Sequence, residues 1–186
     1  MMIAATVSFT AGLEGQWAIT AVDAITGPGL KPAPRLSAFG AVEPAEGAWT
    51  LTGFTSNVRY ANRAEVTALR ARHADLGRPA ATRAALIPIR KSEAWWALAQ
   101  DERRDVLEEQ SRHTAIGLEY LPQIARRLIH SRDLGQPFDF LTWFEFAPEH
   151  VADFDRLLER LRGTPEWRYV EREVDVRLDL AGAQTS

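Results

Sequence analysis

The chain has 186 residues, of which 46% are hydrophobic and 25% charged, so it is long enough to bury a core of its own. Its net charge of −3 gives no electrostatic reason to expect nucleic acid or an anionic membrane as a partner. There is no cysteine, which excludes disulfides, iron–sulfur clusters, thiolate-ligated metals and cysteine nucleophiles.

The N-terminal segment does not have the pattern of a secretion signal. It lacks a basic region, and its apolar run is interrupted by Thr6, Ser8 and Thr10. No stretch of the chain approaches the roughly 18 apolar residues that a membrane helix needs. We therefore expect a soluble, cytoplasmic protein without a membrane partner.

Glycine and proline divide the first part of the chain into short segments. Alternating, β-branched and aromatic residues predict strands over 16–23, 36–42 and 49–60. A helix is expected over 62–77, because Asn62 and Glu65 form a capping-box pattern and Gly77 is a natural stop.

The second half begins with a strand over 85–92, in which Pro88 indicates an edge or an irregularity. A helical region follows, with Ser92 and Asp101 as candidate caps for its two segments. The runs 123–131 and 138–146 flank a polar turn and predict a β-hairpin.

A last helix and a last strand are predicted near the C-terminus. The helix opens at Pro148, and its apolar residues are spaced for one buried face, namely Phe154, Leu157, Leu158 and Leu161. The final strand is expected within 167–180, where apolar and charged residues alternate.

The predicted order of the second half is β–α–β–β–α–β, the ferredoxin-like pattern. The first half is a weaker, shortened version of it. We predict an α+β fold of two such units that share an antiparallel sheet or form a barrel-like pair. The shortened unit spans 1–80, the second spans 81–180, and 181–186 is a tail.

Common catalytic signatures are missing from the sequence. It has no glycine-rich nucleotide fingerprint, no P-loop, no nucleophile elbow and no His-Glu-x-x-His pair. The only two lysines, Lys31 and Lys91, would permit a Schiff base, but nothing around them supports one.

Of the four histidines, His113 has the most suggestive surroundings. His73 and His150 lie in charged or turn-adjacent sequence, and His130 is expected to border the core. His113 is predicted well inside a helix, one turn before Gly117, which would let a flat ligand approach closely. The plainer interpretation of that glycine is a helix end, which needs no ligand.

The predicted hairpin offers a candidate arginine. Alternation puts Arg126 and Leu128 on one face of its first strand, and Thr142 and Phe144 on one face of its second. If these faces coincide, Arg126 projects into an apolar wall and needs an anionic partner. The alternative is a surface arginine or an ion pair, for example with Glu145.

Six tryptophans are a high number for this length. Trp95 and Trp96 precede His113 by a little under twenty residues. Core packing is the ordinary role for such side chains, although aromatic residues near an isolated histidine also suit a haem pocket.

Three separated stretches together resemble the chlorite dismutases, in particular their short-chain, dimeric lineage. These are 83–150 (RAALIPIRKSEAWW through FEFAPEH), 164–178 (TPEWRYVEREVDVRL) and 53–60 (GFTSNVRY). The resemblance covers nearly everything after residue 50. It implies a homodimer of the α+β barrel type that binds haem b in the C-terminal unit.

The resemblance also implies roles for individual residues. His113 matches the proximal iron ligand, Glu166 matches the carboxylate that accepts the other ring N–H, and Arg126 matches the distal arginine. The remaining matches are the distal wall (Leu128, Thr142, Phe144), the tryptophan pair at the haem edge (Trp95, Trp96) and a pair near the propionates (Asn57, Tyr60).

The activity implied in this way is conversion of chlorite to chloride and dioxygen, through a ferryl haem and a transient hypochlorite held by the distal arginine. Chlorite and other small anions are the expected partners, and detoxification is one possible use. Alternatives are a haem peroxidase or a coproheme decarboxylase-like relative. A non-catalytic haem sensor or carrier and a cofactor-free interaction module also stay open.

Overall fold

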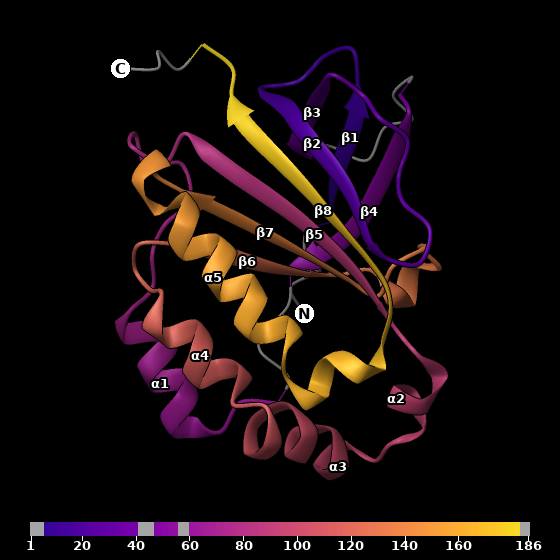
Figure 1. The fold of residues 1–186 in the computed structure, drawn as a ribbon, viewed down its shortest axis with the longest axis vertical. Coiled ribbons are helices and arrows are strands. Elements are labelled where there is room, and N and C mark those ends of the chain that lie inside the picture. Colours follow the sequence, from indigo (N-terminus) through magenta and orange to yellow (C-terminus); the bar gives the residue numbers. More distant parts are fainter. Residues whose placement is uncertain (1–5, 41–46, 56–59, 183–186) are drawn as a thin grey trace.

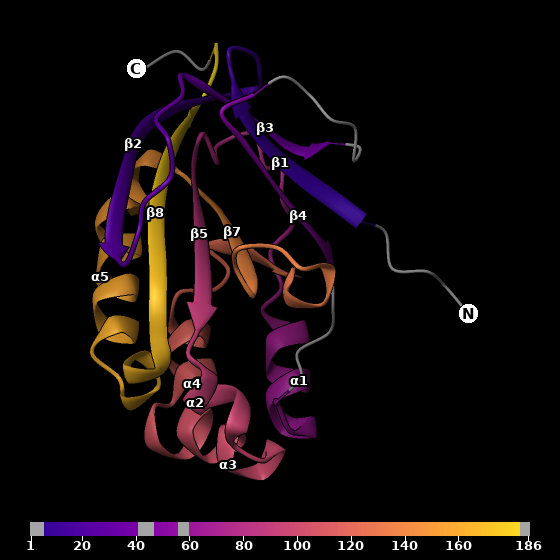
Figure 2. The same ribbon diagram turned by 90° about the vertical axis from the view of Figure 1, so that its right-hand side faces the viewer.

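The computed structural model describes residues 6–40, 47–55 and 60–182, and in these eight antiparallel strands close into one barrel (Figures 1 and 2). The order around the barrel is β1-β3-β2-β8-β5-β7-β6-β4. The bounds are β1 Thr6–Gly12, β2 Trp17–Thr26, β3 Arg35–Gly40, β4 Trp49–Thr55, β5 Arg83–Lys91, β6 Ala125–His130, β7 Phe140–Phe146 and β8 Val170–Leu180.

The predicted α+β class and antiparallel pairing are confirmed, but strand β1 was not among the predicted elements. It pairs with both β3 and β4, and its Phe9 and Ala11 are fully buried in the barrel. The segment is short and rich in Ser and Thr, so its partners, rather than its own composition, decide that it forms a strand.

The first helix, α1 (Arg63–Ala71), begins as predicted. The side chain of Asn62 accepts from the backbone N–H of Glu65, and Glu65 accepts from the N–H of Asn62, which completes the capping box. The helix ends six residues before Gly77, so the predicted stop is wrong.

The helical region predicted after β5 as two segments is divided into four pieces in the structure. These are α2 (Glu93–Ala97), α3 (Gln100–Arg104), a π-helical turn η1 (Asp105–Gln110) and α4 (His113–Glu119). Ser92 precedes α2 without a capping hydrogen bond, and Asp101 lies inside α3, whose N-cap is Ala99. His113 is the first residue of α4 rather than an interior one, because Arg112 adopts a left-handed backbone conformation (φ 53°) that interrupts the helix.

Strand β5 is paired on both sides, with β7 and with β8, so Pro88 does not mark an edge. The ladder to β8 is instead interrupted at Ile87 and Pro88, which is where the missing N–H of proline is tolerated. The predicted β6–β7 hairpin is confirmed, with a short 3-10 turn at Arg132–Leu134.

Helix α5 (Val151–Arg162) follows a 3-10 turn at Pro148–His150, and β8 follows another, η4 (Pro165–Tyr169). One apolar cluster fills the barrel, and a second lies between β5–β7 and α5. The four apolar side chains predicted for one face of α5 are all buried in the second cluster. Within the described residues, no helix is long and apolar enough to cross a membrane.

Candidate active site

A cavity of about 850 Å³ lies between β5–β7 and the helices α1, α4 and α5. Most of its lining is apolar or aromatic. Its described charged side chains are four cations and one carboxylate, namely Arg70, Lys91, Arg126, Arg127 and Glu166. A large apolar cavity with a few convergent polar groups is the usual form of a ligand site.

On one side of the cavity, His113 is bound to a buried carboxylate. Its Nδ1 lies 2.7 Å from Oε2 of Glu166, and the Nζ of Lys91 lies 2.7 Å from the other oxygen, Oε1. Glu166 and Lys91 are only 3% and 6% exposed. In the neutral imidazole the carboxylate therefore holds the proton on Nδ1 and leaves the lone pair on Nε2, which has no hydrogen-bond partner among the described residues.

The charge state of Glu166 follows from its partners. Burial by itself would raise the pKa of this carboxyl, but the charges and hydrogen bonds of His113 and Lys91 lower it to about 2. Glu166 is thus ionised at neutral pH despite its burial, and it can only accept hydrogen bonds.

Two contacts fix the start of α4 and the turn that carries Glu166. The backbone N–H of Glu166 donates to Oγ of Ser111 at 2.9 Å. The carboxylate of Glu108 accepts from the backbone N–H and the hydroxyl of Thr114, the residue after His113. Burial raises the pKa of Glu108, and the hydrogen bonds from Thr114 oppose this shift. The π-helical turn places Glu108 here, and such turns are frequent at functional sites.

The opposite wall comes from the hairpin. Arg126 faces Phe144 and Leu128 faces Thr142 across the β6–β7 ladder, so the four side chains share one face and line the cavity. This confirms the predicted coincidence of faces. The suggested ion pair with Glu145 is wrong, because that carboxylate accepts from Nε1 of Trp143 and from the N–H of Gly77.

Arg126 has no hydrogen bond or ion pair with any residue that the structure describes. Burial lowers the pKa of its guanidinium, while the charge of Glu108 raises it. An arginine stays protonated in proteins, so Arg126 brings to the cavity a positive charge without a paired carboxylate among the described residues, and five N–H donors. It is suited to hold an anion there.

The helix wall is open at Gly117, one turn after His113. A Cβ atom placed on Gly117 would meet nothing within 4 Å. The absence of a side chain therefore widens the cavity beside His113 instead of serving a tight turn or close backbone packing.

The other predicted site residues are divided between two places. Tyr60 and Trp95 line the cavity. Trp96 does not: it lines a smaller neighbouring pocket, stacked 3.6 Å from the guanidinium of Arg132, and its Nε1 donates to Asp139. Asn57 lies outside the described residues.

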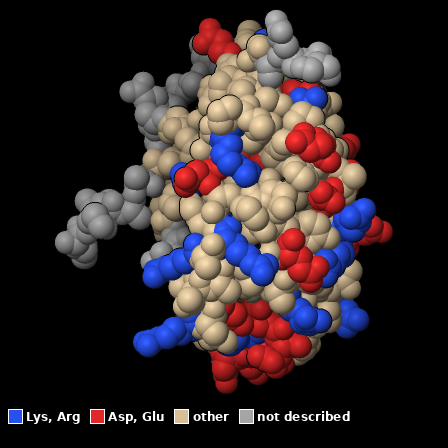
Figure 3. Space-filling model, turned by 90° about the vertical axis from the view of Figure 1, so that its left-hand side faces the viewer, with Lys and Arg blue, Asp and Glu red and all other residues tan. Residues whose placement is uncertain are grey.

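The face of the molecule drawn in Figure 3 does not share the positive character of the cavity. Figure 3 shows acidic side chains gathered at the end of the molecule where α3 lies in Figure 1, and mixed charges elsewhere on that face. Attraction of an anion is therefore a local property of the cavity and not of the net charge.

Comparison with known proteins agrees with this geometry. A family model described as chlorite dismutase matches residues 33–178. The chain belongs to the chlorite dismutase family. The matched range includes His113, Glu166 and Arg126.

A solved structure of dimeric chlorite dismutases from Nitrobacter winogradskyi is 53% identical to this chain, with a TM-score of 0.90 over 95% of this chain and 99% of that one. The chlorite dismutase from Candidatus Nitrospira defluvii in complex with imidazole is 29% identical, with a TM-score of 0.57 over 77% of this chain and 56% of that one.

A curated chlorite dismutase from Ideonella dechloratans is 34% identical over 84 residues. The matched stretch covers 45% of this chain and 27% of that relative, so this chain spans only part of the length of the curated relative.

The residues present fit a haem group. The cavity is large and mostly apolar, Gly117 leaves room beside His113, and the cations can neutralise propionates. No cluster of three or more metal-binding side chains occurs in the described parts of the chain. A single imidazole whose other nitrogen is hydrogen-bonded to a carboxylate suits an iron ion that the porphyrin already coordinates, because such an ion needs only one protein ligand.

Several residues of the site were not identified as site residues from the sequence. Lys91 was noted only as one of two lysines, although its place on the buried side of β5 was a usable signal. Trp167 lines the cavity beside Glu166, and Glu108 and Ser111 anchor α4. No local pattern marks these three, because their partners lie elsewhere in the chain or across a break in a helix.

Proposed function

We propose that this chain is a haem b enzyme that converts chlorite to chloride and dioxygen. The observation that carries the proposal is that two groups lie on different walls of one cavity. One is His113, hydrogen-bonded to Glu166, which Lys91 binds in turn, and the other is Arg126, which has no ion-pair partner among the described residues. Membership of the chlorite dismutase family and the named activity of its relatives support it.

His113 would hold the iron through Nε2, with Glu166 fixing the tautomer and strengthening the ligand. The haem iron would supply the exchange of an oxygen atom, a reaction that no side chain of this protein can perform. Lys91 keeps Glu166 ionised, and the apolar lining restricts the entry of water.

Arg126 would bind chlorite through its planar donor fork and retain the hypochlorite fragment until dioxygen forms. Retaining the fragment is a proximity effect, which can be worth several kcal/mol of barrier. Leu128, Thr142 and Phe144 form the wall that limits escape of the fragment. Trp95 and Tyr60 would border the haem, while the roles proposed for Trp96 and Asn57 at the haem edge rest on the family resemblance.

The test is reconstitution of the purified protein with haemin, followed by addition of chlorite under an oxygen electrode. We expect a Soret band of a histidine-ligated haem and release of one dioxygen per chlorite. A haem spectrum without oxygen release would support a peroxidase, a decarboxylase-like relative or a haem carrier, which peroxide and coproheme assays separate. Failure to bind haemin would overturn the proposal.

We also propose a homodimer, because the relative from Nitrobacter winogradskyi is described as dimeric. The division into two ferredoxin-like units at 1–80 and 81–180 is supported by the strand order, which is 4-1-3-2 both for β1–β4 and for the equivalent strands of β5–β8. The cytoplasmic location stays a prediction from the sequence.

A further inference from the structure

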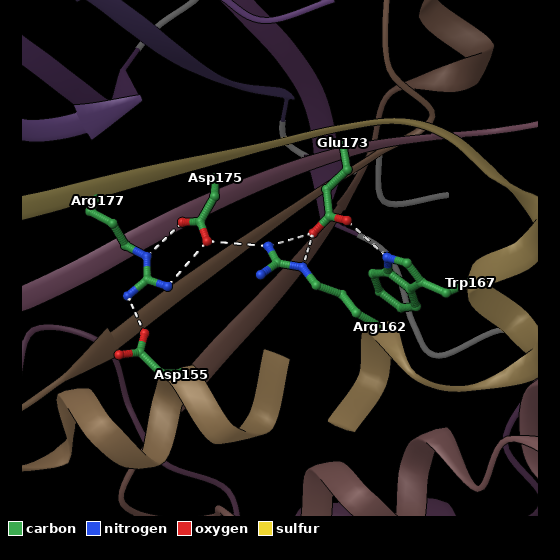
Figure 4. A network of polar contacts seen from close by, with 6 residues as sticks. All are labelled: Asp155, Arg162, Trp167, Glu173, Asp175 and Arg177. Carbon is green, nitrogen blue, oxygen red and sulfur yellow. Dashed lines mark hydrogen bonds and ion pairs between the residues drawn. The ribbon is translucent and has the colours of Figure 1, made fainter. Parts of the chain in front are cut away.

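The carboxylate of Glu173 connects three elements behind the cavity. Nε1 of Trp167, on η4, donates to its Oε2 at 2.8 Å, and Nε of Arg162, at the end of α5, donates to its Oε1 at 2.9 Å. Figure 4 shows the two donors approaching the carboxylate from opposite sides. Since Glu173 belongs to β8, it joins η4 and α5 to the barrel wall.

Glu173 is completely buried. A buried carboxylate is tolerated only when its oxygens are paired, and removal of one partner is strongly destabilising. With one oxygen bound to η4 and the other to α5, the carboxylate constrains the position of both elements.

Trp167 transmits this constraint to the cavity. It follows Glu166 directly in the chain, and its ring lines the cavity. The Nζ of Lys91, which binds Glu166, lies 5.7 Å from the ring centroid of Trp167 and 4.3 Å from that of Trp95. Trp167 is therefore covalently adjacent to Glu166, and its indole ring also lies beside the ammonium group of Lys91, which binds Glu166.

A second buried carboxylate in the same network, Asp175, differs from Glu173 in its partners. Asp175, two residues further along β8, accepts from Nη2 of Arg162 at 3.2 Å and from Nε of Arg177 at 2.6 Å. Arg177 in turn donates to Asp155 (Figure 4). Among the described residues, Asp175 has no hydrogen bond or ion pair with η4, although it shares Arg162 with Glu173.

We propose that Trp167 and Glu173 are positioning residues for the His113–Glu166 pair. Their hydrogen bond holds η4 so that the carboxylate of Glu166 stays in line with Nδ1 of His113. The inference rests on the proposed function, in which His113 binds the haem iron. The hydrogen bond between Trp167 and Glu173 would then control the electron density on that ligand.

The experiment compares Glu173→Gln and Trp167→Phe with the control Asp175→Asn in the haem-reconstituted full chain. In Glu173→Gln the amide oxygen stays with the cationic Arg162, so the NH2 group faces the indole N–H of Trp167 and that hydrogen bond is lost. In Asp175→Asn the NH2 group likewise replaces an acceptor oxygen opposite one of two arginines, so each variant loses one contact of a buried carboxylate that Arg162 binds. Thermal unfolding of the haem-free proteins measures the structural cost, which we expect to be similar for Glu173→Gln and Asp175→Asn.

The readouts specific to positioning are haem transfer to a scavenger protein, the iron(III)/iron(II) potential and the ferrous iron–histidine stretching frequency. For Glu173→Gln and Trp167→Phe we expect haem loss to be faster by roughly tenfold, as is typical when the partner of a metal ligand is disturbed. The potential should rise and the stretching frequency fall, because the imidazole becomes less anionic. The control should change neither.

The double variant should behave like the single ones, because both remove the same hydrogen bond. Equal shifts in the control and the test variants, or no shift in any of them, would overturn the positioning role. A parent protein that binds no haem would instead refute the proposed function. In that case the low-field NMR signal of the Nδ1 proton of His113 decides the inference, since it must move in Glu173→Gln and not in Asp175→Asn.

Discussion

Nδ1 of His113 and Oε2 of Glu166 lie 2.7 Å apart although 53 residues separate them in the chain. The bond requires a proton on Nδ1, so in the neutral imidazole Nε2 keeps its lone pair for a metal. The second oxygen of Glu166 is bound by Lys91, which keeps the carboxylate ionised. The state of the imidazole is thus set by two residues that a sequence motif around His113 would not include.

Glu166→Gln should weaken the retention of haem. The amide oxygen can still accept from Nδ1, but the negative charge that strengthens the imidazole is lost, and the NH2 group faces Lys91. We expect the haem affinity to fall roughly 10- to 100-fold and the iron potential to rise. Haemin titration and spectroelectrochemistry measure both. Glu149→Gln, an exposed carboxylate on the turn before α5, serves as the control.

His113→Ala should abolish stable haem binding and leave room for a free ligand beside Gly117. Added imidazole should then restore a Soret band, because it supplies the missing nitrogen. Haem binding by the variant without imidazole, at the affinity of the parent, would show that another residue holds the iron.

Arg126→Ala should lower the affinity for chlorite and let hypochlorite leave the cavity. We expect bleaching of the haem within fewer turnovers, and hypochlorite detectable with a chlorinatable trap. Arg126→Lys keeps the charge without the donor fork and should fall between the two. Arg156→Ala, an exposed arginine of α5, should match the parent. Equal durability of Arg126→Ala and the parent would contradict the assigned role.

Gly117→Leu should block haem without harming the fold. The position is open in this structure, and leucine is favoured over glycine in a helix by up to about 1 kcal/mol. We therefore expect equal or higher stability of the haem-free protein in denaturant, with much weaker haemin binding. Gly117→Ala should give a smaller loss. Undiminished haemin affinity in Gly117→Leu would mean that the ligand does not lie against α4.

The stability of the haem-free protein should fall in acid because of Glu166. The folded-state pKa is lowered from the ordinary 4.5 to about 2, so the carboxylate contributes its stabilisation above pH 4.5. This stabilisation is lost as the pH falls from about 4.5 to about 2. Urea unfolding across this range should show a steeper decline for the parent than for Glu166→Gln. Identical slopes would mean that the ion pairs with Lys91 and His113 contribute nothing to folding.

Much of the chain from residue 62 onward could be predicted from the sequence, because its signals are local. The capping box at Asn62, the apolar face of α5 and the β6–β7 hairpin with Arg126 opposite Phe144 all follow from spacing within one or two adjacent elements. Strand β1 could not be predicted, since its pairing partners decide its conformation. The break before His113 depends on the left-handed Arg112, which no residue preference indicates.

The sequence by itself determined the α+β class, the alternation that puts Arg126 on one face with Leu128, and the absence of thiol chemistry. Only the tertiary structure decided that β1–β8 close into one barrel and that Lys91, His113 and Glu166 meet. The reason is that alternation and capping act between neighbours in the chain, whereas a buried ion pair forms between groups that only the closed sheet and its helices bring within hydrogen-bonding distance.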